Sequence, residues 1–207
     1  MRYIRIYDLS IPLTQGMPYF KGDPIPDIRQ FKNIQKDGYN IIEMKIGTHT
    51  GTHIDAPSHF IEGGKTVDQL DLSDLMGKAT VVRYDPNTGL RLPKEISKIV
   101  FLYTGYNSSW NNFKTFEDFS YINPEDATVL RDGGAKVVGI DSPSAEMPNS
   151  KNFDTHHILL GSSIPIVENL KSEALSMIVN RSINIHIIPI LVKGGDGAPA
   201  RVFAMES

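Results

Sequence analysis

The chain has 207 residues, of which 40% are hydrophobic and 22% are charged, and its formal net charge is −3. These totals are typical of a globular protein with an ordinary core, and we expect residues 1–207 to form a single domain. The weak charge gives no sign of nucleic-acid binding, and no apolar run approaches the roughly 18 residues that span a bilayer. Because cysteine is absent, disulfides, thiol nucleophiles and thiolate metal ligands are excluded.

The N-terminal residues alternate between apolar and charged side chains, which predicts a strand over 3–9 and no signal-peptide core. We therefore expect a cytoplasmic protein. Prolines and glycines then interrupt the chain to about residue 27, in a stretch that also carries Tyr19 and Phe20. Long irregular segments in compact chains are usually functional. Two interpretations stay open for the stretch 10–27: a surface loop, or a lid over a pocket.

The rest of the chain alternates between strand-like and helix-like segments, as in α/β proteins. Strands are expected at 40–47, 79–84, 98–103, 136–141, 164–168, 183–192 and 200–205. Helical turns are expected within 67–76, from Pro93, from a cap at Asn123 to Gly133, from a cap at Asp154 to Gly161, and over 170–178. A helix followed by a buried strand, as over 123–141, predicts a crossover unit.

Three of the six histidines lie within eleven residues, in the order His49-Thr-Gly-Thr-His53-Ile-Asp55-Ala-Pro-Ser-His59. Imidazoles and a carboxylate at such spacing suit a zinc-like ion. On a flat strand at about 3.3 Å per residue, His49 and His53 would stand roughly 13 Å apart, too far for one ion. Thr50-Gly51-Thr52 disfavours a helix, so we expect a tight turn there.

A second group of candidates follows later in the chain. His156 and His157 are adjacent, and Glu168 follows twelve residues after His156. This group alone is weak evidence, because capped helices often carry surface histidines. A metal site needs further ligands, however, and the chain offers few others. His186 alternates with isoleucines, which predicts a strand residue that faces away from the core.

The segment H-T-G-T-H-I-D-A-P-S-H resembles the H-x-G-T-H-x-D-x-P-x-H signature of the putative cyclase family, which includes bacterial kynurenine formamidases and other metal-dependent hydrolases. Further segments resemble the same family in the same order along the chain, at 22–24, 138–144, 156–170 and 196–201. The similarity therefore covers nearly the whole chain.

This resemblance implies an α/β fold of the swivelling β/β/α type, with a mixed sheet and flanking helices. It also implies one or two divalent ions per subunit, with zinc expected and manganese as the alternative, and a homo-oligomer, either a dimer or a tetramer. The implied ligands, with Asp55 shared where two ions bind, are His49, His53, Asp55, His156 and Glu168. His59 is implied to be the acid/base residue.

The expected function is hydrolysis of a C–N amide bond in a small molecule, as in arylformamidases, by a metal-activated water. Kynurenine formamidases have a Trp-Pro pair before the early Gly-Asp, where this chain has Tyr19-Phe20-Lys21. An aromatic wall remains, so we expect Tyr19 and Phe20 to bind substrate. Two alternatives stay open: a lyase or cyclase that acts through a metal-stabilised enolate, and a non-catalytic metal-binding protein. None of these involves a nucleic acid or a membrane.

Overall fold

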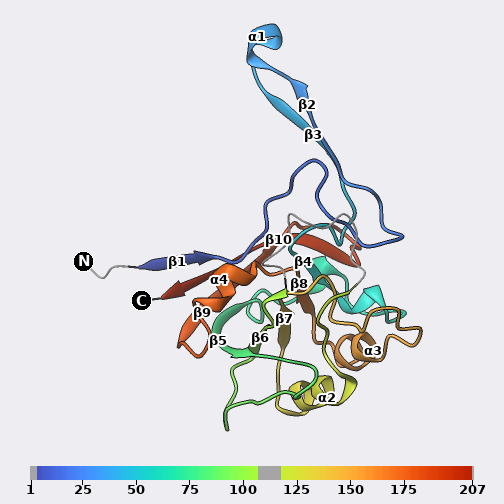
Figure 1. The fold of residues 1–207 in the computed structure, drawn as a ribbon. Coiled ribbons are helices and arrows are strands. Elements are labelled where there is room, and N and C mark those ends of the chain that lie inside the picture. Colours follow the sequence, from blue (N-terminus) through green and yellow to red (C-terminus); the bar gives the residue numbers. More distant parts are fainter. Residues whose placement is uncertain (1–3, 107–117, 207) are drawn as a thin grey trace.

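The computed structural model describes residues 4–106 and 118–206, and its main body is built around one mixed β-sheet (Figure 1). Within these residues, the strand order of the sheet is β1-β10-β4-β8-β7-β6-β5-β9. The bounds are Arg5–Asp8 for β1, His53–Asp55 for β4, Met76–Arg83 for β5, Ile99–Tyr103 for β6, Val137–Ile140 for β7, Ile166–Glu168 for β8, Ile183–Pro189 for β9 and Gly197–Glu206 for β10. The predicted α/β class with a mixed sheet is confirmed.

The sheet curls so that β4 and β9, which are far apart in the strand order, both pair with β10. The first residues of β10 pair with β4, and the following residues pair with β9, both antiparallel. Strands β5, β6, β7 and β8 run parallel to one another. Parallel neighbours need a crossover connection, and the helix α2 (Pro124–Asp132) provides one between β6 and β7, as predicted. The result is a barrel-like sheet that encloses one part of the core.

Side chains that alternate along the central strands fill two separate apolar layers. One layer lies inside the curled sheet and includes Phe101, Ile185 and Val202. The other lies between the outer face of the sheet and the helices, where Leu102 and Ile140 pack with residues of α2 and α3 (Asp154–Gly161). A further short helix, α4, spans Ser172–Ser176. Within the described ranges, none of the helices combines the length and apolar character needed to cross a membrane.

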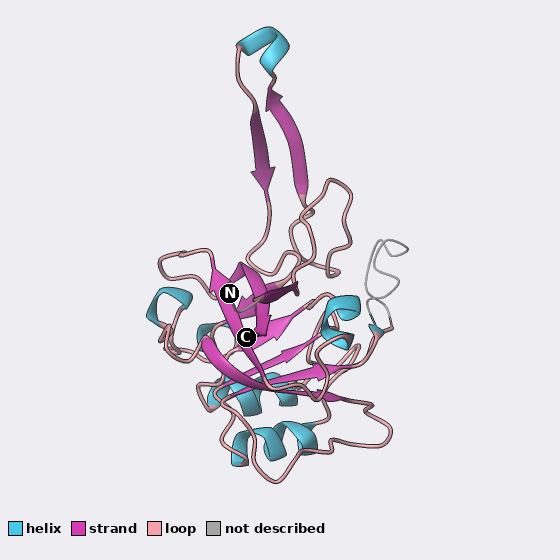
Figure 2. Cartoon of the chain, turned by 90° about the vertical axis from the view of Figure 1, so that its left-hand side faces the viewer, coloured by secondary structure: helices cyan, strands magenta, loops and turns pink. Residues whose placement is uncertain are grey.

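Residues 27–45 form an arm that projects away from the body (Figures 1 and 2). It consists of β2 (Asp27–Lys32) and β3 (Ile41–Lys45), paired antiparallel, with the single-turn helix α1 (Ile34–Asp37) at its tip. All five residues of β3 are exposed. The strand expected at 40–47 therefore forms, but it lies outside the main sheet.

Two local expectations were wrong. No helix follows Pro93, because the segment runs as a loop in which the Ser97 backbone N–H donates to Thr80 Oγ1 at 2.8 Å. Asp154 is the first residue of α3 rather than its cap, and Phe153 takes the cap position in a left-handed conformation, with φ +53°. The helical turn expected within 67–76 does form, as the short 3₁₀ turn Val67–Gln69, and Met76 then begins β5.

Candidate metal centre and pocket

The antiparallel pair β4–β8 carries the centre of the predicted site. His53 and Asp55 lie two residues apart on β4, so their side chains project from the same face of the strand. Glu168, at the end of β8, is the direct cross-strand partner of His53. Their exposed fractions are 2% for His53, 1% for Asp55 and 4% for Glu168. Two carboxylates and an imidazole are thus buried side by side, which is costly unless they are paired or hold a cation.

The predicted turn before β4 is confirmed, and it brings His49 back to this cluster. Gly51 has φ +68°, and a Cβ atom there would lie 2.7 Å from Leu13 Cδ2, so the turn requires glycine. The rings of His49 and His53 are 5.0 Å apart, far closer than on a straight strand. His49 Nδ1 lies 2.7 Å from Asp55 Oδ1. The 3₁₀ turn Pro57–His59 then places His59 beside His49, with ring centroids 4.0 Å apart.

His53 has a nitrogen that nothing in the described structure satisfies. Its Nδ1 donates to the backbone oxygen of Gly51 at 2.8 Å, and since a carbonyl can only accept, this bond fixes the proton on Nδ1. The buried Nε2 lies 3.3 Å from Asp55 Oδ1 and 3.4 Å from Glu168 Oε2, but it makes no hydrogen bond to either. In the neutral ring the lone pair of Nε2 points between two carboxylates, as a bound cation requires, so these residues fit a divalent metal ion.

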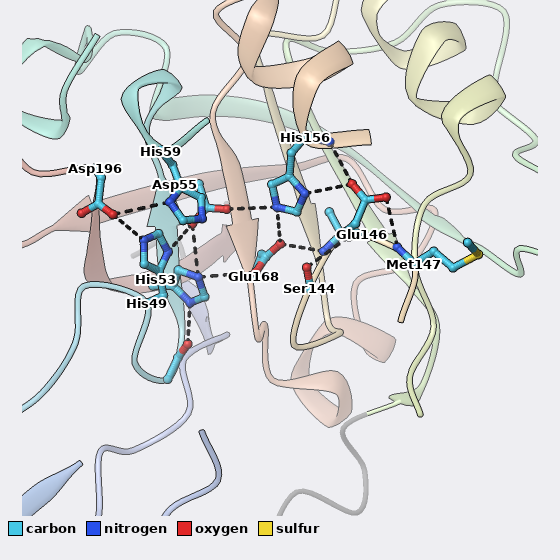
Figure 3. Close-up of polar contacts among 12 residues, drawn as sticks. His49, His53, Asp55, His59, Ser144, Glu146, Met147, His156, Glu168 and Asp196 are labelled. Carbon is cyan, nitrogen blue, oxygen red and sulfur yellow. Dashed lines mark hydrogen bonds and ion pairs between the residues drawn. The ribbon is translucent and has the colours of Figure 1, made fainter. Parts of the chain in front are cut away.

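His156, on α3, approaches the same carboxylates from the other side (Figure 3). Its Nε2 is 3.6 Å from Asp55 Oδ2 and 3.5 Å from Glu168 Oε1. Asp55 therefore presents one oxygen to His49 and His53 and the other to His156. This arrangement suits a carboxylate shared by two ions, and the structure brings all five predicted ligands together.

Two sets of donor atoms are close enough for one ion each. One set is His53, Asp55 and Glu168, and the other is His49, Asp55 and His59. The second set includes His59, the predicted acid/base residue, so its position also suits a ligand. The atoms within each set lie no more than 4.8 Å from one another.

When no ion is bound, burial and the neighbouring carboxylates together determine which histidines of the cluster are protonated. Burial disfavours the charged form of His53, yet the carboxylates of Asp55 and Glu168 raise its pKa to about 10. Burial likewise opposes the charge on His156, whose pKa the same two carboxylates and Glu146 raise well above the ordinary value. The pKa of His59 is instead lowered, mainly by burial. The lowered pKa favours the neutral form of His59 at pH 7, which a general base requires.

A cavity of about 750 Å³ opens onto these side chains. The segment 18–23, which includes Tyr19 and Phe20, lines it, so the irregular stretch 10–27 covers part of the pocket. Three further aromatic residues line it together with the segment 143–150. The rings of Phe20 and Phe119 meet edge-on at 6.2 Å, and those of Phe60 and Phe153 lie 5.1 Å apart. The pocket therefore has a polar floor and sides that are partly aromatic, as small-molecule sites commonly do.

Sequence reasoning missed two acidic residues of this site. Asp196 Oδ2 lies 3.0 Å from His49 Nε2 and 3.4 Å from His59 Nδ1. Glu146 Oε2 lies 3.1 Å from His156 Nδ1. Asp196 opens the 196–201 segment that resembled the family, which was a usable signal, whereas nothing in the sequence placed Glu146 beside His156. His157 is exposed, and His186 stacks on Phe203 away from the pocket.

Buried histidines and carboxylates at the floor of an aromatic pocket define a protein with a histidine–carboxylate metal centre. Comparison with known proteins gives the family. The model of the family described as "Putative cyclase" matches residues 7–147. The chain is 32% identical to a kynurenine formamidase of Geobacillus thermodenitrificans over 203 residues, 94% of each chain. The chain therefore belongs to the putative cyclase family.

Solved structures agree with this assignment. A protein described as a potential metal-dependent hydrolase with cyclase activity is 26% identical, with a TM-score of 0.79 over 99% of both chains. Isatin hydrolase A from Ralstonia solanacearum has a TM-score of 0.82 over 99% of this chain and 92% of its own, at 20% identity. At that identity the second comparison supports the fold alone.

Proposed function

We propose that this protein is a metal-dependent hydrolase that cleaves the C–N bond of a small amide, with aryl formamides as the first substrate class. One observation carries the proposal: His59, the neutral imidazole, lies at the pocket side of a buried cluster whose donors suit a divalent ion. Relatives named kynurenine formamidase support the choice of amide, and make the formamide of kynurenine the first compound to test.

Zinc is the metal we propose, with manganese as the alternative. As the family resemblance implies, His49, His53 and Asp55 would hold one ion, and Asp55, His156 and Glu168 would hold a second. The two sets of close donor atoms described above divide the same cluster differently, with His59 grouped with His49 and Glu168 grouped with His53. A divalent ion in such a site supplies Lewis-acid chemistry, since it lowers the pKa of water towards 7 and polarises a carbonyl oxygen.

His59 supplies the proton transfer in this proposal. Burial keeps it neutral, so it can take a proton from the attacking water. The resulting imidazolium is stabilised by Asp196, whose Oδ2 lies 3.4 Å from His59 Nδ1. It then returns the proton to the leaving amine.

The walls of the pocket support the choice of an aryl group. Phe20 and Phe119 contact each other edge-on, which leaves ring faces for a flat substrate to stack on. Tyr19 lines the same side. We propose that Tyr19 and Phe20 bind the aryl part while the amide faces the histidines.

We also propose that residues 1–207 act as one domain and that the protein is a homo-oligomer. An isolated two-stranded hairpin is marginally stable in water, yet the arm exposes Phe31, Ile42 and Met44. Association with a second copy would cover these side chains. Light scattering of the purified protein, compared with a Phe31→Ser, Met44→Ser variant, tests this assembly.

Substitution of His59 by alanine tests the function. We expect kcat to fall by about 10²- to 10⁴-fold, the usual contribution of a general acid–base group, while zinc content stays the same. His157→Ala, which removes an exposed histidine from α3, is the matched control and should keep full activity. Retained activity in His59→Ala would contradict the acid/base role, and loss of zinc would make His59 a ligand instead.

Hydrolysis in heavy-oxygen water distinguishes the lyase alternative. A hydrolase places solvent oxygen in the acid product, whereas a simple elimination does not. If zinc binds and stabilises the protein but a panel of formamides and cyclic amides shows no turnover, the protein is a non-catalytic metal binder.

A further inference from the structure

Glu146 is a buried carboxylate that the proposed reaction does not use. It lies on the loop between β7 and α3, with an exposed fraction of 7%, and its side chain points at the start of α3 (Figure 3). Oε2 accepts from the ring Nδ1 of His156 at 3.1 Å and from the backbone N–H of the same residue at 3.3 Å. Glu146 Oε2 therefore accepts two hydrogen bonds from the same residue, His156.

The hydrogen bond from the His156 backbone N–H to Glu146 provides an acceptor that the start of α3 otherwise lacks. The first N–H groups of a helix lack partners inside the helix, and a side chain at the cap position normally accepts one of them. In α3 the cap residue is Phe153, whose side chain cannot accept. Glu146 takes this role from outside the helix, and its charge is favourable at the positive end of the helix dipole.

The hydrogen bond between Glu146 and the His156 ring determines whether the other ring nitrogen, Nε2, carries a proton. A carboxylate at Nδ1 accepts its proton, so Nε2 is left without one in the neutral ring. That Nε2 lies 3.6 Å from Asp55 Oδ2 and 3.5 Å from Glu168 Oε1, the two carboxylates at the floor of the pocket. Paired carboxylate and histidine groups of this kind orient metal-binding imidazoles.

The same loop also holds Glu168, the other residue on the His156 side of the cluster. The backbone N–H of Ala145 donates to Glu168 Oε1 at 2.6 Å. Adjacent residues 145 and 146 therefore fix both Glu168 and His156. His49 is held instead by Asp55 and Asp196, on the other side of the cluster.

We propose that Glu146 is the positioning residue for a second divalent ion, which it favours by holding His156 in one tautomer and one ring orientation. This inference rests on the proposed metal-dependent function and adds a cause for two-ion occupancy. Glu146 acts through His156 and has no direct part in the chemistry.

Zinc binding to Glu146→Gln tests the inference. The variant keeps the size of the side chain but loses its charge, and Glu125→Gln is the matched control, since it removes an exposed acid from the first turn of α2. Metal-free proteins are titrated with zinc, and the two binding steps are followed by calorimetry. We expect the weaker step to lose about 10- to 100-fold in affinity, as for other partners of metal-binding histidines, while the tighter step stays within about threefold.

A second measurement separates positioning from a purely structural role. In the zinc-loaded protein, ¹⁵N chemical shifts of the His156 ring should report one tautomer, with the proton on Nδ1, in the unaltered chain and in Glu125→Gln. Glu146→Gln should show mixed tautomers or a free ring. Glu146→Asp, which keeps the charge on a shorter side chain, should recover part of the second step.

The outcomes are distinct. If both zinc steps of Glu146→Gln match those of the unaltered protein, the role of Glu146 is wrong and the proposed function stands. If the unaltered protein binds a single ion, the inference also fails. If it binds no divalent ion at all, the proposed function fails with it.

Discussion

Asp196 lies within 3.4 Å of His59 and faces its Nδ1 atom. The same oxygen, Oδ2, is 3.0 Å from Nε2 of His49. One carboxylate from the loop before β10 therefore joins the proposed proton carrier to a proposed metal ligand. Its side chain is 45% exposed, so solvent screens the contact and its main effect is on orientation rather than on stability.

Asp196→Asn should lower kcat by about tenfold, because His59 loses the group that orients it. Removal of the negative charge also lowers the pKa of His59, so the acidic limb of the pH–activity profile should move to lower pH. Asp68→Asn is the control: Asp68 accepts from the backbone of Gly194 in the same loop but contacts neither histidine. An unchanged profile in Asp196→Asn would exclude this pairing.

The affinity for zinc should rise with pH between about 6 and 9. Without an ion, the pKa of His53 is about 10 and that of His156 is raised well above the ordinary value, so both are protonated at pH 7. Zinc must displace these protons, which costs less free energy as pH rises. Titration in buffers of different ionisation enthalpy measures the protons released. A release of none would show that the histidines are neutral before zinc binds.

The stability of the ion-free protein should show the opposite slope. The folded-state pKa of His53 is raised, so its attraction to the carboxylates stabilises fully below about pH 6.5 and is lost as pH rises towards 10. The urea midpoint of chelator-treated protein should therefore fall between pH 6.5 and 9.5. His53→Gln should flatten this dependence. Zinc-loaded protein should keep its midpoint, since the ion replaces the protons.

Gly197→Ala should weaken zinc binding. A Cβ atom at residue 197 would lie 2.6 Å from His49 Cε1 and 2.9 Å from the backbone oxygen of Ile54, so His49 must move. Gly139→Ala is the control, because its Cβ would meet Phe101 at 2.5 Å in the core rather than a histidine. Both should lose about 1–3 kcal/mol of stability from overpacking. Only Gly197→Ala should lose zinc affinity, and equal losses would mean a general effect of destabilisation.

Much of the central sheet could be predicted from sequence because its strands are short apolar runs bounded by turn residues. The turn before β4 was also predictable, since ion geometry excludes a straight strand and Gly51 allows the bend. The arm could not be predicted: β3 has an apolar pattern like that of a core strand, and nothing in sequence shows that it leaves the body. The helix expected from Pro93 does not form. The segment runs as a loop in which the backbone N–H of Ser97 donates to the side chain of Thr80.

The site was predictable in its list of residues but not in their partners. His49, His53, Asp55 and His59 stand together in sequence, so local chemistry was enough to suggest them. Asp196 reaches His49 only through the closure of the sheet, and Glu146 reaches His156 only through the path of the β7–α3 loop. Such contacts depend on long-range packing, which spacing along the chain does not report.

The pairing of His53 opposite Glu168 has a consequence for how this protein can change over evolution. Side chains alternate along a strand, so one residue inserted into β4 or β8 would turn a proposed metal ligand to the opposite face. A substitution in β4 or β8 changes one side chain and leaves the others in place. A single insertion in either strand would instead reverse the direction of the side chains that follow it. Changes of length should therefore be tolerated best in the surface loops and at the tip of the arm, which lie outside these two strands (Figure 1).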